Sequence, residues 1–255
     1  SARSDENGEV TAKVRAGTAP ANVIVLATHA PTGETAPSSN LVVASGVAVL
    51  GQVSLATNAL NPIGYNRIGS QVVTISVTAT DRSGNPVPDG TAVNFISEEG
   101  GNITPSCALA SGSCQVSFTP NGVQPADGHV QILAVIKGSE GFIDNNGNKV
   151  FDDGDTFTPE VHEVGEPYAD NNNNGIYDAG EHFTDTNNDG VRNAGNNVWS
   201  GPNCQHSTLC DSSSELIDLG VQLRLILSDW RSPTLCELGD LSLIHISEPT
   251  RRHLI

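Results

Sequence analysis

The chain has no methionine, few aromatic residues and little charge. Of its 255 residues, 4% are aromatic and 16% are charged, whereas Gly (26 residues) and Pro (14 residues) are frequent. Asn, Ser, Thr and Val are also plentiful. This composition favours a loop-rich, all-β protein over a helical one.

Basic residues and long apolar runs are scarce as well. Twelve Lys and Arg stand against 29 Asp and Glu, a formal net charge of -17. This excludes a nucleic-acid partner, because phosphate contacts need a basic face. No apolar run approaches the length of a membrane span, and no signal peptide is visible at the start. For a secreted protein we therefore expect the chain to be an internal fragment.

The acidic charge is concentrated in residues 140–196. This stretch holds 13 Asp and Glu against two basic residues, Lys149 and Arg192, and so supplies -11 of the net charge. Such a density of like charge repels unless cations neutralise it. On composition alone, a disordered acidic linker is the alternative.

The acidic stretch repeats one pattern three times: an aromatic residue, a spacer, then a twelve-residue loop of Asp, Asn and Gly. Side-chain oxygens recur at loop positions one, three, five, nine and twelve, which is the spacing of a calcium loop of the EF-hand type. Position seven offers a backbone carbonyl. The predicted ligands are Asp144, Asn146, Asn148, Val150, Asp152 and Asp155 in the first loop, Asp170, Asn172, Asn174, Ile176, Asp178 and Glu181 in the second, and Asp185, Asn187, Asp189, Val191, Asn193 and Asn196 in the third.

The three loops differ in expected calcium affinity. The second is the best match, since Glu181 can bind through both oxygens. The first has Lys149 where glycine is preferred and a shorter Asp in last place. The third ends in Asn196 and has two carboxylates against three in the others, so we expect it to be the weakest. A decayed fourth copy starts at Asp155–Thr158, with Pro159 in place of the next first Asp.

These loops are not expected to be true EF-hands, because only three residues separate the second from the third. They resemble the stacked calcium loops of thrombospondin-like repeats, in which ion binding and folding are one event. The aromatic leaders Phe142, Tyr168 and Phe183 are expected to pack as a small core between the loops.

The rest of the chain predicts strands. In 71–81, Val73, Ile75 and Val77 alternate with Thr and Ser, and further strands are expected at 92–97 and 115–119. The near-continuous apolar run 130–136 predicts a central strand. After about eighty residues without such a pattern, alternation returns at 221–227 as a final strand.

The first 46 residues carry shorter strand patterns at Val10–Val14, 23–26 and 41–43. Three strands bury too little surface to be a domain, so we expect 1–46 to be the end of a preceding unit.

The five cysteines include two close pairs, Cys107 with Cys114 and Cys204 with Cys210. Close pairs in a β protein with a thin core predict disulfides and an oxidising compartment. Zinc binding by Cys204, His206 and Cys210 is an alternative that lacks a fourth ligand at a usual spacing.

Residues 81–91, which contain Asn-Pro-Val-Pro-Asp-Gly-Thr, resemble bacterial Ig-like domains of the invasin and intimin type, as do Cys107…Cys114 and Ala126–Val130. The resemblance implies Ig-like β-sandwich modules in tandem. Residues 1–46 would end one module, and 47–230 would form the next, with a calcium-binding insertion (140–203) before the last strand. It further implies an extracellular or cell-surface location, anchored through parts outside this chain, with neighbouring modules or a host receptor as partners.

The final residues, 231–255, differ from the rest. Leu241–Arg251 resembles a translated adapter from sequencing libraries, so we expect this tail to be artefactual. A short natural C-terminal element is the alternative.

Three functions fit these features: a calcium-stiffened stalk module of an adhesin, a carbohydrate- or protein-binding module, or an accessory domain of an extracellular enzyme. Catalysis within the chain is not expected. The seven His are scattered, and no Gly-x-Ser-x-Gly or His-Glu-x-x-His motif occurs. Trp199 and Tyr177 are the aromatic residues near the loops that a ligand could contact.

Overall fold

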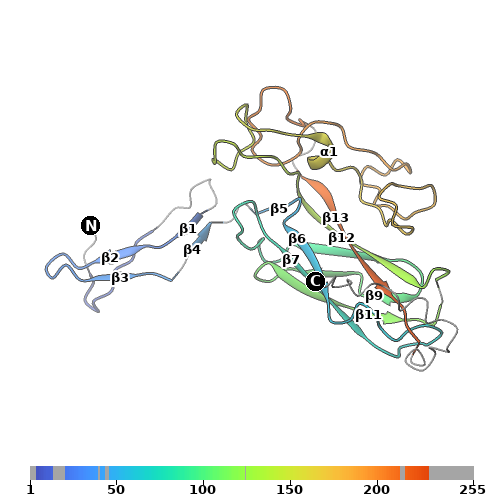
Figure 1. The fold of residues 1–255 in the computed structure, drawn as a ribbon. Coiled ribbons are helices and arrows are strands. Elements are labelled where there is room, and N and C mark those ends of the chain that lie inside the picture. Colours follow the sequence, from blue (N-terminus) through green and yellow to red (C-terminus); the bar gives the residue numbers. More distant parts are fainter. Residues whose placement is uncertain are drawn as a thin grey trace, which may run out of the picture.

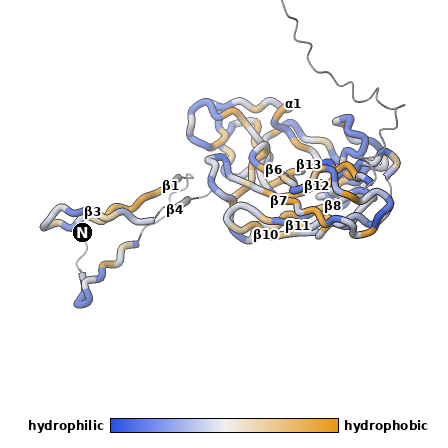
Figure 2. The backbone as a smooth tube through the Cα atoms, turned by 60° about the horizontal axis from the view of Figure 1, so that its bottom comes forward, coloured by the Kyte–Doolittle hydropathy of each residue, from blue (hydrophilic) through white to orange (hydrophobic). Residues whose placement is uncertain are grey.

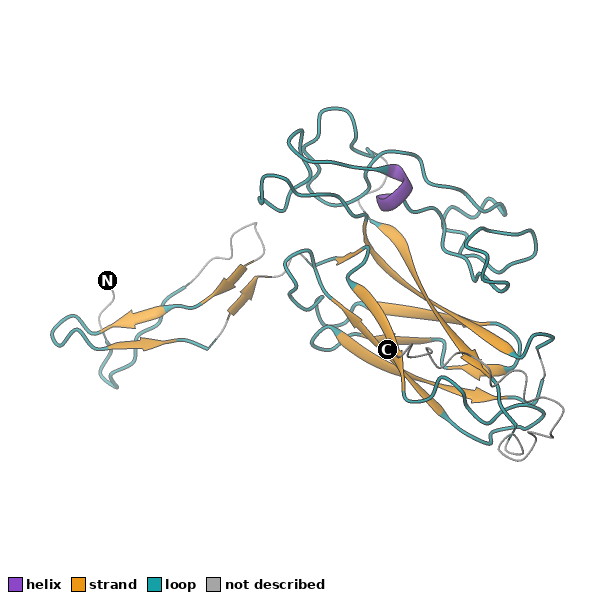
Figure 3. Cartoon of the chain, in the orientation of Figure 1, coloured by secondary structure: helices purple, strands orange, loops and turns teal. Residues whose placement is uncertain are grey.

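The structure is a computed structural model that describes residues 4–13, 21–39, 41–43, 46–123, 125–212 and 216–229. The described chain is nearly all β, as the composition predicts, and its single helix is one turn, α1 (Pro159–His162) (Figure 3). The strands are β1 (Ala21–Val23), β2 (Leu26–Thr28), β3 (Thr35–Pro37), β4 (Leu41–Val43), β5 (Ala48–Val49), β6 (Val53–Thr57), β7 (Val73–Ala79), β8 (Ala92–Ser97), β9 (Gly101–Ile103), β10 (Ser106–Ala108), β11 (Ser113–Pro120), β12 (His129–Ser139) and β13 (Ile217–Ile226).

Two sheets form the main body, which we call the two-sheet unit (46–139 and 217–229). One has the order β10-β8-β12-β13, with β5 added beside β12, and the other has the order β6-β7-β11-β9 (Figure 1). All pairs are antiparallel except β5 with β12. The inward side chains of both sheets share one apolar core.

The two-residue period places the core as the sequence predicts. Val73, Ile75 and Val77 on β7 are fully buried, while the Thr and Ser between them are half-buried or exposed. Figure 2 shows hydrophobic stretches along these strands. The burial of one face of β7 follows directly from its alternation.

β12 is buried on both faces, and it lies between β8 and β13 as the prediction of a central strand requires. One face joins the shared core. The other carries Leu133 and Val135, which pack against Ala169 from the acidic segment. The apolar run is continuous because both faces of β12 are buried, one in the shared core and the other against the insertion.

The N-terminal strands pair among themselves. β1 pairs with β4 and β2 with β3, and Figure 1 shows these strands extending away from the two-sheet unit. The strand predicted at Val10–Val14 is not formed over Val10–Lys13, and Val14 lies outside the described residues. Alternation alone did not suffice there, because a strand also needs a partner. The tail 231–255 lies outside the described residues too.

Both predicted disulfides are present. Cys107–Cys114 joins β10 to β11, and Cys204–Cys210 closes a short loop in the acidic segment. The second bridge uses both thiols that the zinc alternative would need. Within the described residues, no helix is long and apolar enough to cross a membrane.

Candidate metal centre

The acidic loops lie in the connection between β12 and β13, residues 140–216, which we call the insertion. It is almost entirely loop, and it lies against the outer face of the sheet that contains β13 (Figure 3). Alternate residues of β13 hold it there. Gln222 donates to the carbonyl of Tyr168 (2.9 Å), Arg224 donates to the carbonyl of Asn171 (3.2 Å), and Asp218 accepts from Thr186 (2.8 Å). The polar side chains that alternate along β13 therefore anchor the loops to the sheet.

The first Asp of each loop organises the turn that follows it. Asp144, Asp170 and Asp185 each accept the backbone N–H groups of loop positions five and six, at 2.8–3.2 Å. A short acidic side chain at this point can bond its own backbone a few residues on. One turn is thus built three times from the same residue type.

The backbone of each loop is left-handed at positions four and six. The residues concerned are Gly147 and Lys149, Asn173 and Gly175, and Asn188 and Gly190, with φ between 57° and 80°. Gly and Asn adopt this conformation readily, whereas Lys does so at a cost. The repeat of these angles shows that the loops share one fold, with Lys149 as the strained member.

Position seven presents a backbone carbonyl in every loop. Within the described residues, the carbonyls of Val150, Ile176 and Val191 accept no hydrogen bond. The side chains of Ile176 and Val191 are both 63% exposed, so these apolar groups face solvent.

The centre of the second loop joins positions three, five and nine. The NH2 groups of Asn172 and Asn174 donate to one carboxylate oxygen of Asp178, at 2.6 and 2.7 Å. The first loop repeats this arrangement, and in the third Asn187 donates to Asn193. These amides place partial positive charge where a cation would sit. To bind an ion, each would present its oxygen instead of its NH2.

Position twelve closes the first two loops. Asp155 and Glu181 each accept the backbone N–H groups of loop positions two and nine, at 2.9–3.1 Å. Asn196 does not act in this way in the third loop. Its hydrogen bonds go to Glu163, Asp211 and Val198. The residue twelve places along from Asp185 therefore does not hold the backbone of its loop in the way that Asp155 and Glu181 hold theirs.

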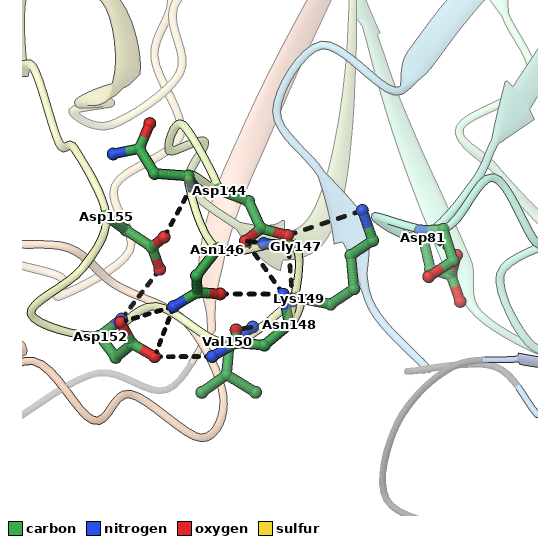
Figure 4. Close-up of polar contacts among 11 residues, drawn as sticks. Asp81, Asp144, Asn146, Gly147, Asn148, Lys149, Val150, Asp152 and Asp155 are labelled. Atoms are coloured by element: carbon green, nitrogen blue, oxygen red, sulfur yellow. Dashed lines mark hydrogen bonds and ion pairs between the residues drawn. The ribbon is translucent and has the colours of Figure 1, made fainter.

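Figure 4 shows the first loop, where Lys149 folds back on the first Asp. Its Nζ lies 3.6 Å from Oδ2 of Asp144, and both side chains are partly shielded from solvent. Hydrogen bonds from Gly154, Asn148 and Asn146 lower the pKa of Asp152. These hydrogen bonds favour the ionised form of Asp152, while Asp144 already has a cationic partner in Lys149.

Replacement of Lys149 with glycine is expected to raise the calcium affinity of the first loop by up to about fivefold, because an exposed ion pair with a predicted ligand carboxylate contributes up to about 1 kcal/mol. Calorimetric titration measures the change. K149Q removes the charge alone and should give the same gain in affinity, whereas only glycine also relieves the left-handed backbone. Unchanged affinity in both variants would contradict the prediction.

The aromatic leaders pack, but as two clusters rather than one. Phe142 lies with Phe151 and Trp199, which are both buried, and Phe157 adds to this group. Tyr168 and Phe183 each meet Tyr177 edge to face. Trp199 and Tyr177 therefore contribute to packing, the first at 3% exposure.

Glu140 is a buried acid that counting within the loops does not reveal. Its side chain is fully buried and accepts from the backbone N–H groups of Val164 (2.9 Å) and Ser200 (2.8 Å). Burial, followed by the nearby Glu163, raises the pKa of Glu140 to about 8. Near neutral pH this carboxyl therefore keeps its proton, so it holds the start of the insertion to two later segments as a neutral group.

No group of three acidic, imidazole or thiol side chains in the described ranges converges closely enough to hold a metal by itself. By their sequence, the loops offer two or three carboxylates each, besides amide and carbonyl oxygens, and such oxygen donors suit calcium better than transition metals. Comparison with protein-family models and with curated proteins finds no match for this chain.

Proposed function

We propose that this chain is a non-catalytic structural module whose insertion binds calcium. The observation that carries the proposal is the threefold repeat of one loop geometry. In each copy an Asp organises the turn, positions four and six are left-handed, and the carbonyl at position seven accepts no hydrogen bond. A calcium ion takes six to eight oxygens in a flexible cage, which such a loop can supply.

The physical benefit of calcium would be order in a segment with little core. The insertion carries most of the chain's net negative charge, and its apolar clusters are small. Each ion would neutralise nearby carboxylates and join turns that are otherwise held by hydrogen bonds. Because β13 anchors the loops, this order would extend to the two-sheet unit. The Ig-like resemblance adds the expectation of an extracellular or bacterial surface protein in which the module acts as a stalk.

Calcium removal tests the proposal. At a calcium concentration 100 times Kd, each ion that binds the folded state alone stabilises it by about 2.7 kcal/mol. We expect EDTA to lower the melting temperature and excess calcium to restore it, whereas excess magnesium should restore it less, since magnesium demands a stricter octahedral geometry. Calorimetric titration of the chelated protein should show heats of calcium binding. A melting curve that neither EDTA nor calcium changes, together with no heat of binding, would refute the proposal.

A further inference from the structure

Four Asn-Gly pairs occur in the chain, at residues 7–8, 121–122, 146–147 and 174–175. In such a pair the asparagine amide can hydrolyse without an enzyme, because glycine has no side chain to shield its backbone nitrogen. That nitrogen attacks Cγ of the asparagine, ammonia leaves, and a cyclic succinimide forms. Water then opens either carbonyl of the ring, which gives aspartate or isoaspartate.

Three of these pairs share one side-chain turn. Oδ1 of Asn121, Asn146 and Asn174 accepts the backbone N–H two residues further on, at 2.9, 2.9 and 2.8 Å. Such a turn folds the side chain over the glycine nitrogen that lies between. The same N–H donor stabilises the negative charge that develops on Oδ1 during the attack. The three amides are therefore matched as electrophiles.

The glycine nitrogens of the two loop pairs are bonded to carboxylates. The N–H of Gly147 donates to Oδ1 of Asp144 (2.7 Å), and that of Gly175 donates to Oδ2 of Asp170 (2.8 Å). Attack requires the nitrogen to lose its proton, and a neighbouring carboxylate disfavours the negative charge that results. A hydrogen bond to a charged group is lost as well.

The leaving groups of the loop pairs are held in the same way. The NH2 of Asn146 donates to both carboxylate oxygens of Asp152, at 3.0 and 3.1 Å, and that of Asn174 donates to Asp178 at 2.7 Å. Loss of ammonia would break these bonds too. Both loop amides are thus restrained at the nucleophile and at the leaving group.

The pair that follows β11 has neither restraint. Among the described residues, the N–H of Gly122 and the NH2 of Asn121 donate to no partner. Asn121 therefore combines the activating turn of the loop pairs with a free nucleophile and a free leaving group.

We propose that Asn121 is a site of spontaneous deamidation in the folded chain, and that Asp144 and Asp170 protect Asn146 and Asn174 from the same reaction. The reaction takes up water, releases ammonia and leaves a new carboxylate directly after β11. The first Asp of these two loops then has a chemical role besides its role in the turn. This proposal does not depend on calcium binding.

The test incubates the full chain in mildly alkaline buffer with EDTA and follows the three sites by peptide mass spectrometry. The same chain, reduced and unfolded in urea, is the matched control, and there the three rates should be similar. In the folded chain Asn121 should react about tenfold faster or more than either loop site, the rate equivalent of one hydrogen bond to a charged group. Equal rates in the folded chain, or a slower Asn121, would overturn the proposal.

D144N tests the protective role directly, since it keeps an acceptor oxygen but removes the charge. It should speed reaction at Asn146 about fivefold, with Asn174 as the internal control. An unchanged rate at Asn146 would overturn the role of the carboxylate. If D144N does not fold, D170N decides the matter, with Asn174 as the site that should react faster and Asn146 as the control.

Discussion

Replacement of Phe151 with alanine is expected to destabilise the insertion by about 3–5 kcal/mol, the range for a large aromatic residue removed from a core. Phe151 is fully buried. Its ring centroid lies 5.1 Å from that of Phe142 and 5.2 Å from that of Trp199, and it stacks on His206 at 4.9 Å. It occupies position eight of the first loop, so its removal leaves a cavity beside the predicted ligands Val150 and Asp152.

The effect should be local to the insertion. The cluster around Phe151 is separate from the core that the two sheets share. Urea unfolding in saturating calcium, followed by Trp fluorescence, should show the loss, since Trp199 lies in the cluster. V161A is the matched control, because Val161 is also in the insertion but is 67% exposed, and it should change stability by less than about 0.5 kcal/mol. Equal unfolding curves for the two variants would show that this cluster does not order the insertion.

The strands and the interior of each loop were predictable because their signals are local. Burial of Val73 and Ile75 follows from alternation, and the turns after Asp144 and Asp170 follow from Asp, Asn and Gly at fixed offsets. The central place of β12 was predicted too, although its outer cover, Ala169, was not. The residues of β12 show that its outer face is buried, but they do not show which distant segment of the chain packs there.

The hydrogen bonding of the third loop could not be read by counting along it, since the carboxylate that accepts its backbone N–H groups is Glu166, which lies before the second loop. A signal was present nonetheless. Glu140, Glu166 and Glu181 each stand four residues before the first Asp of a loop, and Asp155 stands four residues before Pro159 of the decayed copy. Asp155 and Glu181 each close the loop that they end, whereas Glu166 accepts the backbone N–H groups of Thr186 and Asn193 in the third loop. Glu140 bonds no loop in this way, and it accepts instead from Val164 and Ser200.

Arg82 links the two-sheet unit to the insertion, another contact that no local pattern predicts. It follows β7, in a turn held by bonds from Ser83 and Asn85 to Asp81. Its guanidinium lies 3.7 Å from the ring centroid of Phe142, and Nη2 donates to the carbonyl of Glu140 (3.0 Å).

The charge of Arg82 persists at neutral pH. Burial lowers the pKa of Arg82 to about 10, against the opposing influence of Asp144 and Asp155. The group therefore remains a cation close to two predicted ligands of the first loop.

Replacement of Arg82 with alanine is expected to have opposite effects on stability and on calcium affinity. Loss of the ring contact and the hydrogen bond should destabilise the chelated protein by about 2–3 kcal/mol, since a partly desolvated cation–π contact contributes up to about 2 kcal/mol and a hydrogen bond to a charged group about 1.5 kcal/mol or more. Loss of the positive charge beside Asp144 and Asp155 should raise the affinity of the first loop about threefold. Chemical unfolding in EDTA and calorimetric titration measure the two effects separately.

R82K distinguishes docking from charge. Lysine keeps the positive charge but lacks the planar guanidinium group. Only that group can lie over the ring of Phe142 and also donate to the carbonyl of Glu140. It should therefore lose stability without a gain in calcium affinity. If R82A and R82K gave the same calcium affinity as the wild type, the charge of Arg82 would have no influence on the first loop. If both kept full stability, the contacts of β12 and β13 would be enough to hold the insertion to the two-sheet unit. We expect both variants to lose stability and R82A alone to bind calcium more tightly. This combination requires Arg82 to hold the insertion to the two-sheet unit and also to compete with calcium as a cation.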